Sequence, residues 1–161
     1  MKKQKGFSLI ELLIVVAIIL IIAAIAIPNL LRSRMAANEA SAVGSLRTIN
    51  TAEVTYATTY PATGFGGLAA LGGSAATCAT TNGAALANAC LIDEVLSLTG
   101  VKSGYTFTAV AAGGPPAVTY ASTAVPSSPG QSGQRSFCSD QSGVIRYDAA
   151  GGACNGTKPA L

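Results

Sequence analysis

The residues of this chain that could take part in chemistry lie together at its N-terminus. A basic leader containing three lysines ends at Gly6, and an apolar run follows from Phe7 to Ile27 with one charged residue, Glu11. The run can cross the hydrocarbon of a bilayer, which needs about 20 apolar residues in a helix. A carboxylate inside such a run costs roughly 2.5–3.5 kcal/mol at the helix centre and less near its end. We therefore expect Glu11 to have a partner.

Three simpler interpretations of the same segment compete with a partnered carboxylate. Ala24-Ile25-Ala26 fits the cleavage site of a secretory signal. However, the apolar run is longer than the roughly 7–15 residues of such signals, and a carboxylate is out of place there. The segment could also be a plain membrane anchor with Glu11 near the interface, or Glu11 could pair with a leader lysine.

The spacing of K-G-F-S-L-I-E resembles the processing site of type IV prepilins and pseudopilins, and the resemblance extends through Pro28 to Arg34. It implies that a membrane-embedded prepilin peptidase cuts between Gly6 and Phe7 and methylates the new amine of Phe7. It also implies that this amine pairs with Glu11 of a neighbouring subunit, with Pro28 in the same assembly segment. Opposite charges attract strongly in a low-dielectric bundle, and an unpaired charge there is penalised. Glu11 would then set the axial register of a growing filament.

The charge of the chain gives the expected topology. The net charge is +3, but Lys2, Lys3 and Lys5 belong to the leader, and the remaining basic and acidic side chains balance. Leader lysines place the N-terminus in the cytoplasm by the positive-inside rule, so the rest would lie outside the inner membrane. The other basic residues are scattered or follow one helix, which does not favour a nucleic-acid patch.

All four cysteines, Cys78, Cys90, Cys138 and Cys154, fall in this outer part, where disulfides persist. The chain has no histidine and no C-x-x-C pair, so a zinc site is not expected. Three pairings are open. We favour Cys78–Cys90 and Cys138–Cys154, because partners close in sequence fall within single loops. The second pair would also match the C-terminal disulfide loop that the resemblance to type IVa pilins implies.

One long helix is expected from Phe7 to about Thr59, ended by Pro61. Its first part is apolar on all sides. Its second part carries a stripe at three- and four-residue steps that a sheet could cover: Met35, Ala42, Leu46, Ile49, Tyr56 and Tyr60. Glu53 falls within the stripe, and we expect it to be hydrogen-bonded to the remainder of the fold or exposed at an edge.

The second half of the chain predicts a loop-rich segment followed by strands. Residues 61–102 are rich in small and polar residues, with a short helix expected at residues 86–98 that presents Leu91, Val95 and Leu98 on one face. Strands are expected at residues 104–110, 117–123, 135–140 and 143–148, because these segments alternate and are separated by turn residues.

The sequence therefore predicts an α+β fold in which the C-terminal half of a very long helix packs on a four-stranded antiparallel sheet, as the pilin resemblance also implies. The expected parts are a cleaved leader (1–6), a membrane or filament-core helix (7–28), its amphipathic continuation (29–60) and a head (61–161). The head would comprise a loop (61–102), a sheet (103–148) and a disulfide-tied C-terminal loop (138–154).

The expected function is structural. No histidine is present for acid–base work, and the serines and carboxylates form no recognisable catalytic pattern, so neither an enzyme nor a cofactor site is predicted. The resemblance implies a type IV pilus subunit for adhesion, motility or DNA uptake. Such a subunit would be held in the inner membrane and assembled into an extracellular homopolymer by the pilus machinery, with surface or DNA contacts through the head. A pseudopilin of a type II secretion system, or a minor pilin acting as an adhesin, are the alternatives.

Overall fold

The computed structural model describes residues 7–80 and 83–161, which divide into two compact units. We call residues 7–34 the N-terminal unit and Met35–Leu161 the head. The leader, including the expected cleavage residue Gly6, lies outside the described residues.

Helix α1 (Leu9–Thr59) contributes residues to both units. Its end follows from local chemistry: the N–H of Tyr60 still bonds to the carbonyl of Tyr56 at 2.8 Å, but Pro61 has no N–H and disfavours helical geometry in the residue before it. The expected helix is thus confirmed, with its start at Leu9 instead of Phe7.

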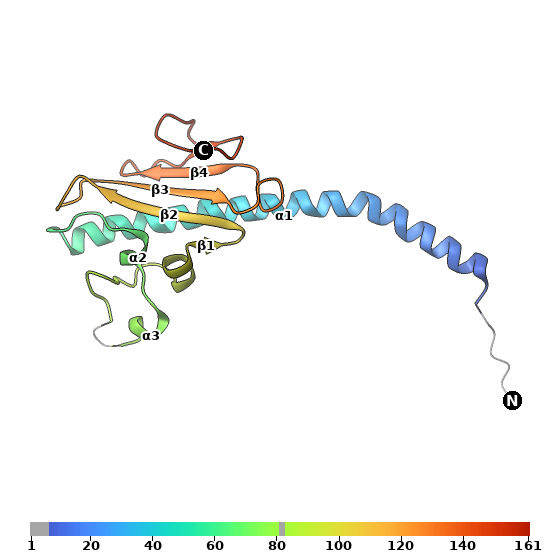
Figure 1. The fold of residues 1–161 in the computed structure, drawn as a ribbon, viewed down its shortest axis with the longest axis horizontal. Coiled ribbons are helices and arrows are strands. Elements are labelled where there is room, and N and C mark those ends of the chain that lie inside the picture. The colour runs from blue at the N-terminus through green and yellow to red at the C-terminus, as the bar shows by residue number, and fades with distance from the viewer. Residues whose placement is uncertain (1–6, 81–82) are drawn as a thin grey trace. The chain divides into compact units, whose positions relative to one another are not determined.

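The head contains one antiparallel sheet in which each strand pairs with the next along the chain. The strands are β1 (Val101–Lys102), β2 (Tyr105–Ala112), β3 (Thr119–Pro126), β4 (Ser136–Asp140) and β5 (Arg146–Asp148). Figure 1 shows β2, β3 and β4 across the part of α1 that belongs to the head. The α+β fold expected from the sequence is confirmed.

The strand number is the part of that prediction that is wrong, because the sheet has five strands and not four. The additional strand is β1, two residues placed within the expected loop 61–102. Gly100, with φ 62°, ends the preceding turn and its carbonyl accepts a 2.6 Å bond from Phe107, which brings residues 101–102 beside β2. Two residues carry no periodicity, so β1 had no sequence signal.

The core lies between the stripe on α1 and the inner face of the sheet. In β2, Tyr105, Phe107 and Ala109 are buried while the residues between them are exposed, as period-two alternation requires. They meet the buried α1 residues Leu46 and Ile49 in one hydrophobic cluster. The stripe expected on α1 is therefore buried as predicted, with Met35 and Tyr60 at its half-buried ends.

The helix expected at residues 86–98 is wrong for its first part, because only its last part, residues 94–98, is helical. The segment between α1 and the sheet has two short helices, α2 (Leu68–Leu71) and α3 (Ala75–Cys78), and one wide helical turn, η1 (Val95–Thr99). The N–H groups of Ala89, Cys90 and Leu91 bond instead to the carbonyls of residues 70–72 at the end of α2. Tertiary hydrogen bonds and the Cys90 disulfide replace the helical pattern there. Of the three side chains expected on one face, Leu91 is half-buried, whereas Val95 and Leu98 are exposed.

Candidate functional site

Glu11 lies in the first turn of α1, and its Oε2 accepts a long 3.4 Å hydrogen bond from the N–H of Ser8. A carboxylate at this place is favoured by the partial positive charge of the helix N-terminus. Within the N-terminal unit it is the one acidic side chain. Phe7, two residues before the helix, is 77% exposed. The segment thus presents a carboxylate that no cation of the described residues neutralises.

The apolar side chains of the N-terminal unit have no protein cover. The most apolar 18-residue stretch of α1 has a mean hydropathy of 3.3 and no buried residue. The large apolar side chains from Phe7 to Leu31 are between 45% and 77% exposed. Length and composition alone would allow this helix to cross a bilayer. A surface of this size is favourable only in lipid or against other protein.

Pro28 lies inside α1, close to the end of the apolar surface. Because proline has no N–H, the carbonyl of Ala24 loses its intrahelical partner. The helix nevertheless continues through Pro28. Arg32 and Arg34 follow and are exposed, so the apolar surface ends in two cations.

In the head, Glu39 and Arg135 form a polar network that sequence reasoning missed. Glu39 Oε1 accepts the backbone N–H groups of Gln134 (2.9 Å) and Arg135 (3.1 Å), and Oε2 lies 2.8 Å from the Nε and Nη2 of Arg135. Burial alone would raise the pKa of Glu39, but these donors outweigh it and hold the pKa below its ordinary value. The guanidinium also lies over Phe137 and Tyr147. Position 39 continues the three- and four-residue steps of the α1 stripe. This spacing could have indicated that the side chain of Glu39 faces the sheet.

Glu53 is the most unusual polar group of the head, because it is completely buried. Its Oε2 accepts the N–H of Gly66 at 2.9 Å, whereas Oε1 has no hydrogen-bond partner among the described residues. Burial raises the pKa of Glu53 to about 7, against the opposing effect of the Gly66 bond. Of the two placements expected for Glu53, the structure has the hydrogen-bonded one.

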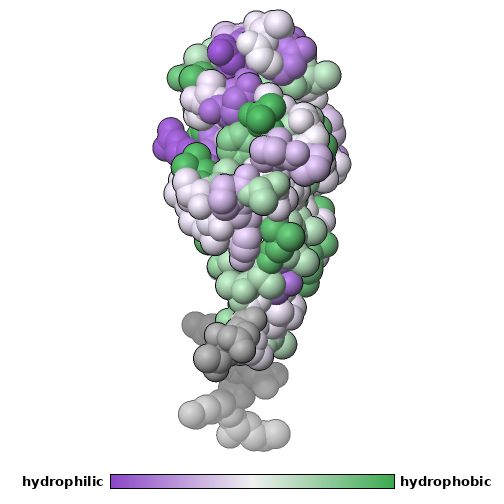
Figure 2. Space-filling view, turned by 90° about the vertical axis from the view of Figure 1, so that its left-hand side faces the viewer, coloured by the Kyte–Doolittle hydropathy of each residue, from purple (hydrophilic) through white to green (hydrophobic). Residues whose placement is uncertain are grey.

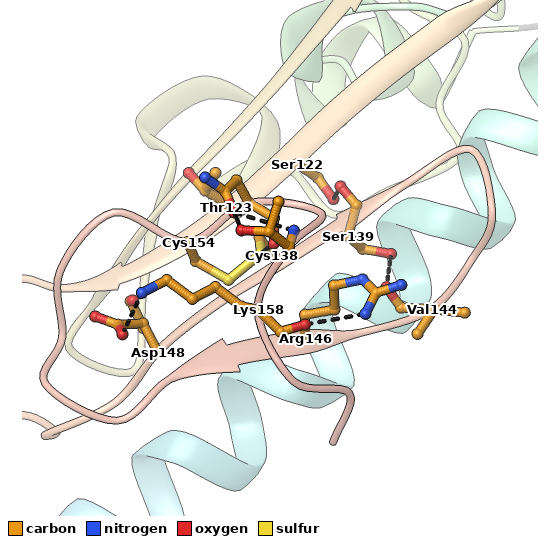
Figure 3. Close-up of a disulfide and its surroundings, with 12 residues drawn as sticks. Ser122, Thr123, Cys138, Ser139, Val144, Arg146, Asp148, Cys154 and Lys158 are labelled. Atoms are coloured by element: carbon orange, nitrogen blue, oxygen red, sulfur yellow. Dashed lines mark hydrogen bonds and ion pairs between the residues drawn. A yellow bond between two sulfur atoms is a disulfide. The ribbon is translucent and has the colours of Figure 1, made fainter.

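Two disulfides close the loops of the head, Cys78–Cys90 and Cys138–Cys154. These are the pairs favoured from sequence. Figure 3 shows the second disulfide beside Arg146, whose Nη1 donates to the carbonyl of Lys158, and beside the ion pair of Lys158 with Asp148 at 2.9 Å. The disulfide and these contacts hold the C-terminal segment along β4 and β5.

The described part of the head exposes fewer large apolar side chains than the N-terminal unit does, among them Val95, Leu98 and Val101. On the face in Figure 2, hydrophobic and hydrophilic residues are interspersed over the head. Among residues 7–80 and 83–161 there is also no group of three or more His, Cys, Asp or Glu side chains that could hold a metal ion. The feature that calls for a partner is therefore the N-terminal unit.

Comparisons with known proteins bear on the same segment. Residues 1–27 match the family model described as the prokaryotic N-terminal methylation motif. The chain is 64% identical over 39 residues to the type IV wide pilus major component PilA4 of Thermus thermophilus, covering 24% of this chain and 30% of that protein. It is 44% identical over 54 residues to the type IV major pilin protein PilA of Myxococcus xanthus, covering 34% of this chain and 24% of that protein.

These similarities span less than a third of the length of either relative. No solved structure matches the chain.

Proposed function

We propose that this chain, a type IV pilin by its N-terminal segment, is a structural subunit of a type IV pilus filament and assembles through α1. The observation that carries the proposal is the uncovered apolar surface of the N-terminal unit, interrupted by the single carboxylate of Glu11. Identity over 39 and 54 residues to two proteins named as major pilus components supports it.

Assembly begins from an inner-membrane pool. The leader lysines hold the N-terminus on the cytoplasmic side, and the head with its two disulfides lies in the periplasm. A prepilin peptidase cuts between Gly6 and Phe7 and methylates the amine of Phe7. The match of residues 1–27 to the methylation motif supports this processing step.

The new amine of Phe7 pairs with Glu11 of a neighbouring subunit when the helices gather in the filament core. In that low-dielectric core an amine without its carboxylate is strongly penalised, so the pair selects one axial register. Pro28 leaves a carbonyl free on α1 and lets the helix adapt to its neighbours. The contact joins different surfaces of successive copies, so growth is open-ended.

The head then forms the outside of the pilus. Its mixed polar and apolar surface and its two disulfide-closed loops are the parts through which adhesion, motility or DNA uptake would operate. Comparison of a deletion strain with the wild type in attachment, surface spreading and transformation assays separates these three roles.

The test of the proposal is electron microscopy of sheared surface filaments, followed by the intact mass of their subunit. Filaments composed of this chain, with a mass that begins at a methylated Phe7, are expected. A Gly6→Leu variant is the matched control and should accumulate as uncut precursor in the membrane. A short periplasmic assembly with no surface filament, or purified subunits that begin at Met1, would contradict the proposal.

A further inference from the structure

Arg32 and Arg34, at the end of the N-terminal unit, have no acidic neighbour on their own helix. Both side chains are exposed. The positions three and four residues away, where helical side chains meet, are Pro28, Asn29, Leu30, Leu31, Met35, Ala36, Ala37 and Asn38. The nearest acid along the chain, Glu39, already has both oxygens bonded to residues 134 and 135. Any protein counter-charge for these two cations would therefore come from outside their own helix.

Their surroundings change during the assembly proposed above. In the membrane pool, cations that directly follow an apolar segment can contact lipid phosphates. A subunit that enters a filament leaves those phosphates behind. A counter-charge in the filament would then come from protein, and a second copy of this chain can supply it if one of its acids is accessible and unpaired.

The acids of the head can be sorted by their contacts. Three are held in ion pairs and one is completely buried: Glu39, Asp93, Asp148 and Glu53. Asp140 accepts the N–H of Ser142, and nearby Arg146 helps to lower its pKa. Glu94 is exposed and, among the described residues, has neither an ion pair nor a side-chain hydrogen bond. Among the described acids of the head, Glu94 is therefore the one whose carboxylate is accessible for an ion pair with another molecule.

The apolar surroundings of Glu94 match those of the arginines. Val95 and Leu98 on η1 are 53% and 59% exposed, and Val101 follows on β1 at 44%. On α1, Leu30 and Leu31 are exposed directly before Arg32. The arginine surface thus carries two cations beside its leucines, whereas the Glu94 surface carries Glu94 and the internally neutralised pair of Asp93 with Lys102, so its net charge is negative. Burying the aliphatic groups would also exclude water from the ion pair, which strengthens it.

We infer that Glu94, Val95, Leu98 and Val101 of one copy dock against residues 30–34 of another copy in the filament, with Glu94 facing Arg32 or Arg34. This inference rests on the proposed function and names a second contact beside that of Glu11. It joins the head of one subunit to the helix of another, where the Glu11 pair joins helix to helix.

Charge reversal with rescue tests this contact in cells that express the full chain. Glu94→Arg should raise the unassembled fraction of subunits about two- to fivefold, because the contact would bring like charges together. Arg32→Glu and Arg34→Glu, made separately, should show whether either has a similar effect. Glu94→Arg combined with the effective arginine variant should restore assembly. Glu94→Gln should act in the same direction as Glu94→Arg but less.

Arg47→Glu is the matched control, because Arg47 is an exposed arginine of α1 without exposed leucines directly before it. Its combination with Glu94→Arg should not restore assembly. Protease resistance of the head and the membrane level of each variant show that the chain folds and inserts. Normal filaments from Glu94→Arg, or rescue by Arg47→Glu instead, would overturn the inference while the proposed function stands. A wild-type chain that forms no filament would overturn both.

Discussion

The N-terminal unit and the head differ in where their side chains find partners. In the N-terminal unit, aliphatic side chains such as Leu20 and Ile25 stay more than 60% exposed. In the head, Leu46 and Phe137 are completely buried, and a deeply buried acid such as Glu39 is matched by donors. The head is stabilised by contacts within the chain, whereas the N-terminal unit depends on lipid or on other copies.

This difference has a practical consequence, because the same kind of substitution should have different effects in the two regions. A change in the head should alter its free energy of unfolding. A change in the N-terminal unit should alter membrane residence or assembly and leave the head intact. All five tyrosines lie in the head, at positions 56, 60, 105, 120 and 147, so tyrosine near-UV circular dichroism of the full chain in detergent reports head unfolding alone.

The largest effect is expected for Glu11→Ala. In the proposed filament core, removing the carboxylate would leave the amine of a processed Phe7 unpaired, which would cost about 3–5 kcal/mol and should nearly abolish assembly. The membrane level of the chain and the unfolding of its head should be unchanged. Immunoblots of the sheared and membrane fractions measure the filament yield and the membrane level, and tyrosine circular dichroism measures the unfolding of the head. A normal filament yield would refute the role of Glu11.

Phe137→Ala should have the largest effect on the head. Phe137 is completely buried and packs against Tyr105, with ring centroids 6.1 Å apart. The cavity should lower the free energy of unfolding by about 3–5 kcal/mol in urea titrations. Leu20→Ala in the N-terminal unit removes a similar apolar side chain and should leave that value unchanged. Equal effects of the two variants would show that the regions are not independent.

Cys138→Ser should destabilise the head by about 2–4 kcal/mol, because the C-terminal loop is no longer closed. Limited proteolysis should then cut between residues 141 and 161 first. The Cys78→Ser variant opens the other loop and serves as a comparison, since it should expose residues near Thr80 instead. Indistinguishable cleavage patterns would mean that the two disulfides do not act locally.

Glu53 predicts a pH dependence confined to the head. Its pKa is raised to about 7, so the stability that its protonated form contributes is complete below the unfolded pKa and is lost as the pH rises through about 7. Between about pH 5 and about pH 8 the head should lose about 2 kcal/mol. Four other carboxyl groups of the head have lowered pKa values, so their titration changes the stability of the head only in more acidic solution: Glu39, Asp93, Asp140 and Asp148.

Glu53→Gln should make the stability of the head nearly constant over that range, as urea titrations at several pH values can show. Glu94→Gln removes an exposed carboxylate and is the control that should keep the wild-type slope. A slope that survives in Glu53→Gln would assign the titration to another group.

The smallest effect is expected for Lys102→Ala. The ion pair of Lys102 with Asp93 is 2.6 Å long, but both side chains are well exposed. Exposed pairs contribute about 0.2–1 kcal/mol and are screened by salt. The difference from the wild type should therefore vanish in concentrated salt, and a larger loss that persists there would point to a structural role for Lys102.

Some elements could be predicted because their signals are local. Helix α1 is indicated by the apolar run and by Pro61, and β2 by the alternation in residues 105–112. These signals depend only on neighbouring residues, so the observed ends of α1 and β2 lie within two residues of the expected ones. The helix prediction failed for residues 86–93 for the opposite reason. Their spacing favours a helix, but hydrogen bonds to the end of α2 and the Cys78–Cys90 disulfide give the segment a different backbone.

The sequence by itself determined that one end of this protein must find an apolar environment and that its single carboxylate must be neutralised there. Both follow from composition and spacing, since a helix that is apolar on every side needs lipid or other protein on every side. Only the tertiary structure decided how the acids of the head are used: Glu39 bonded to Arg135, Glu53 buried with one free oxygen, and Glu94 left exposed. Such assignments depend on groups distant in the chain that approach within a few ångströms, which spacing along the sequence does not specify.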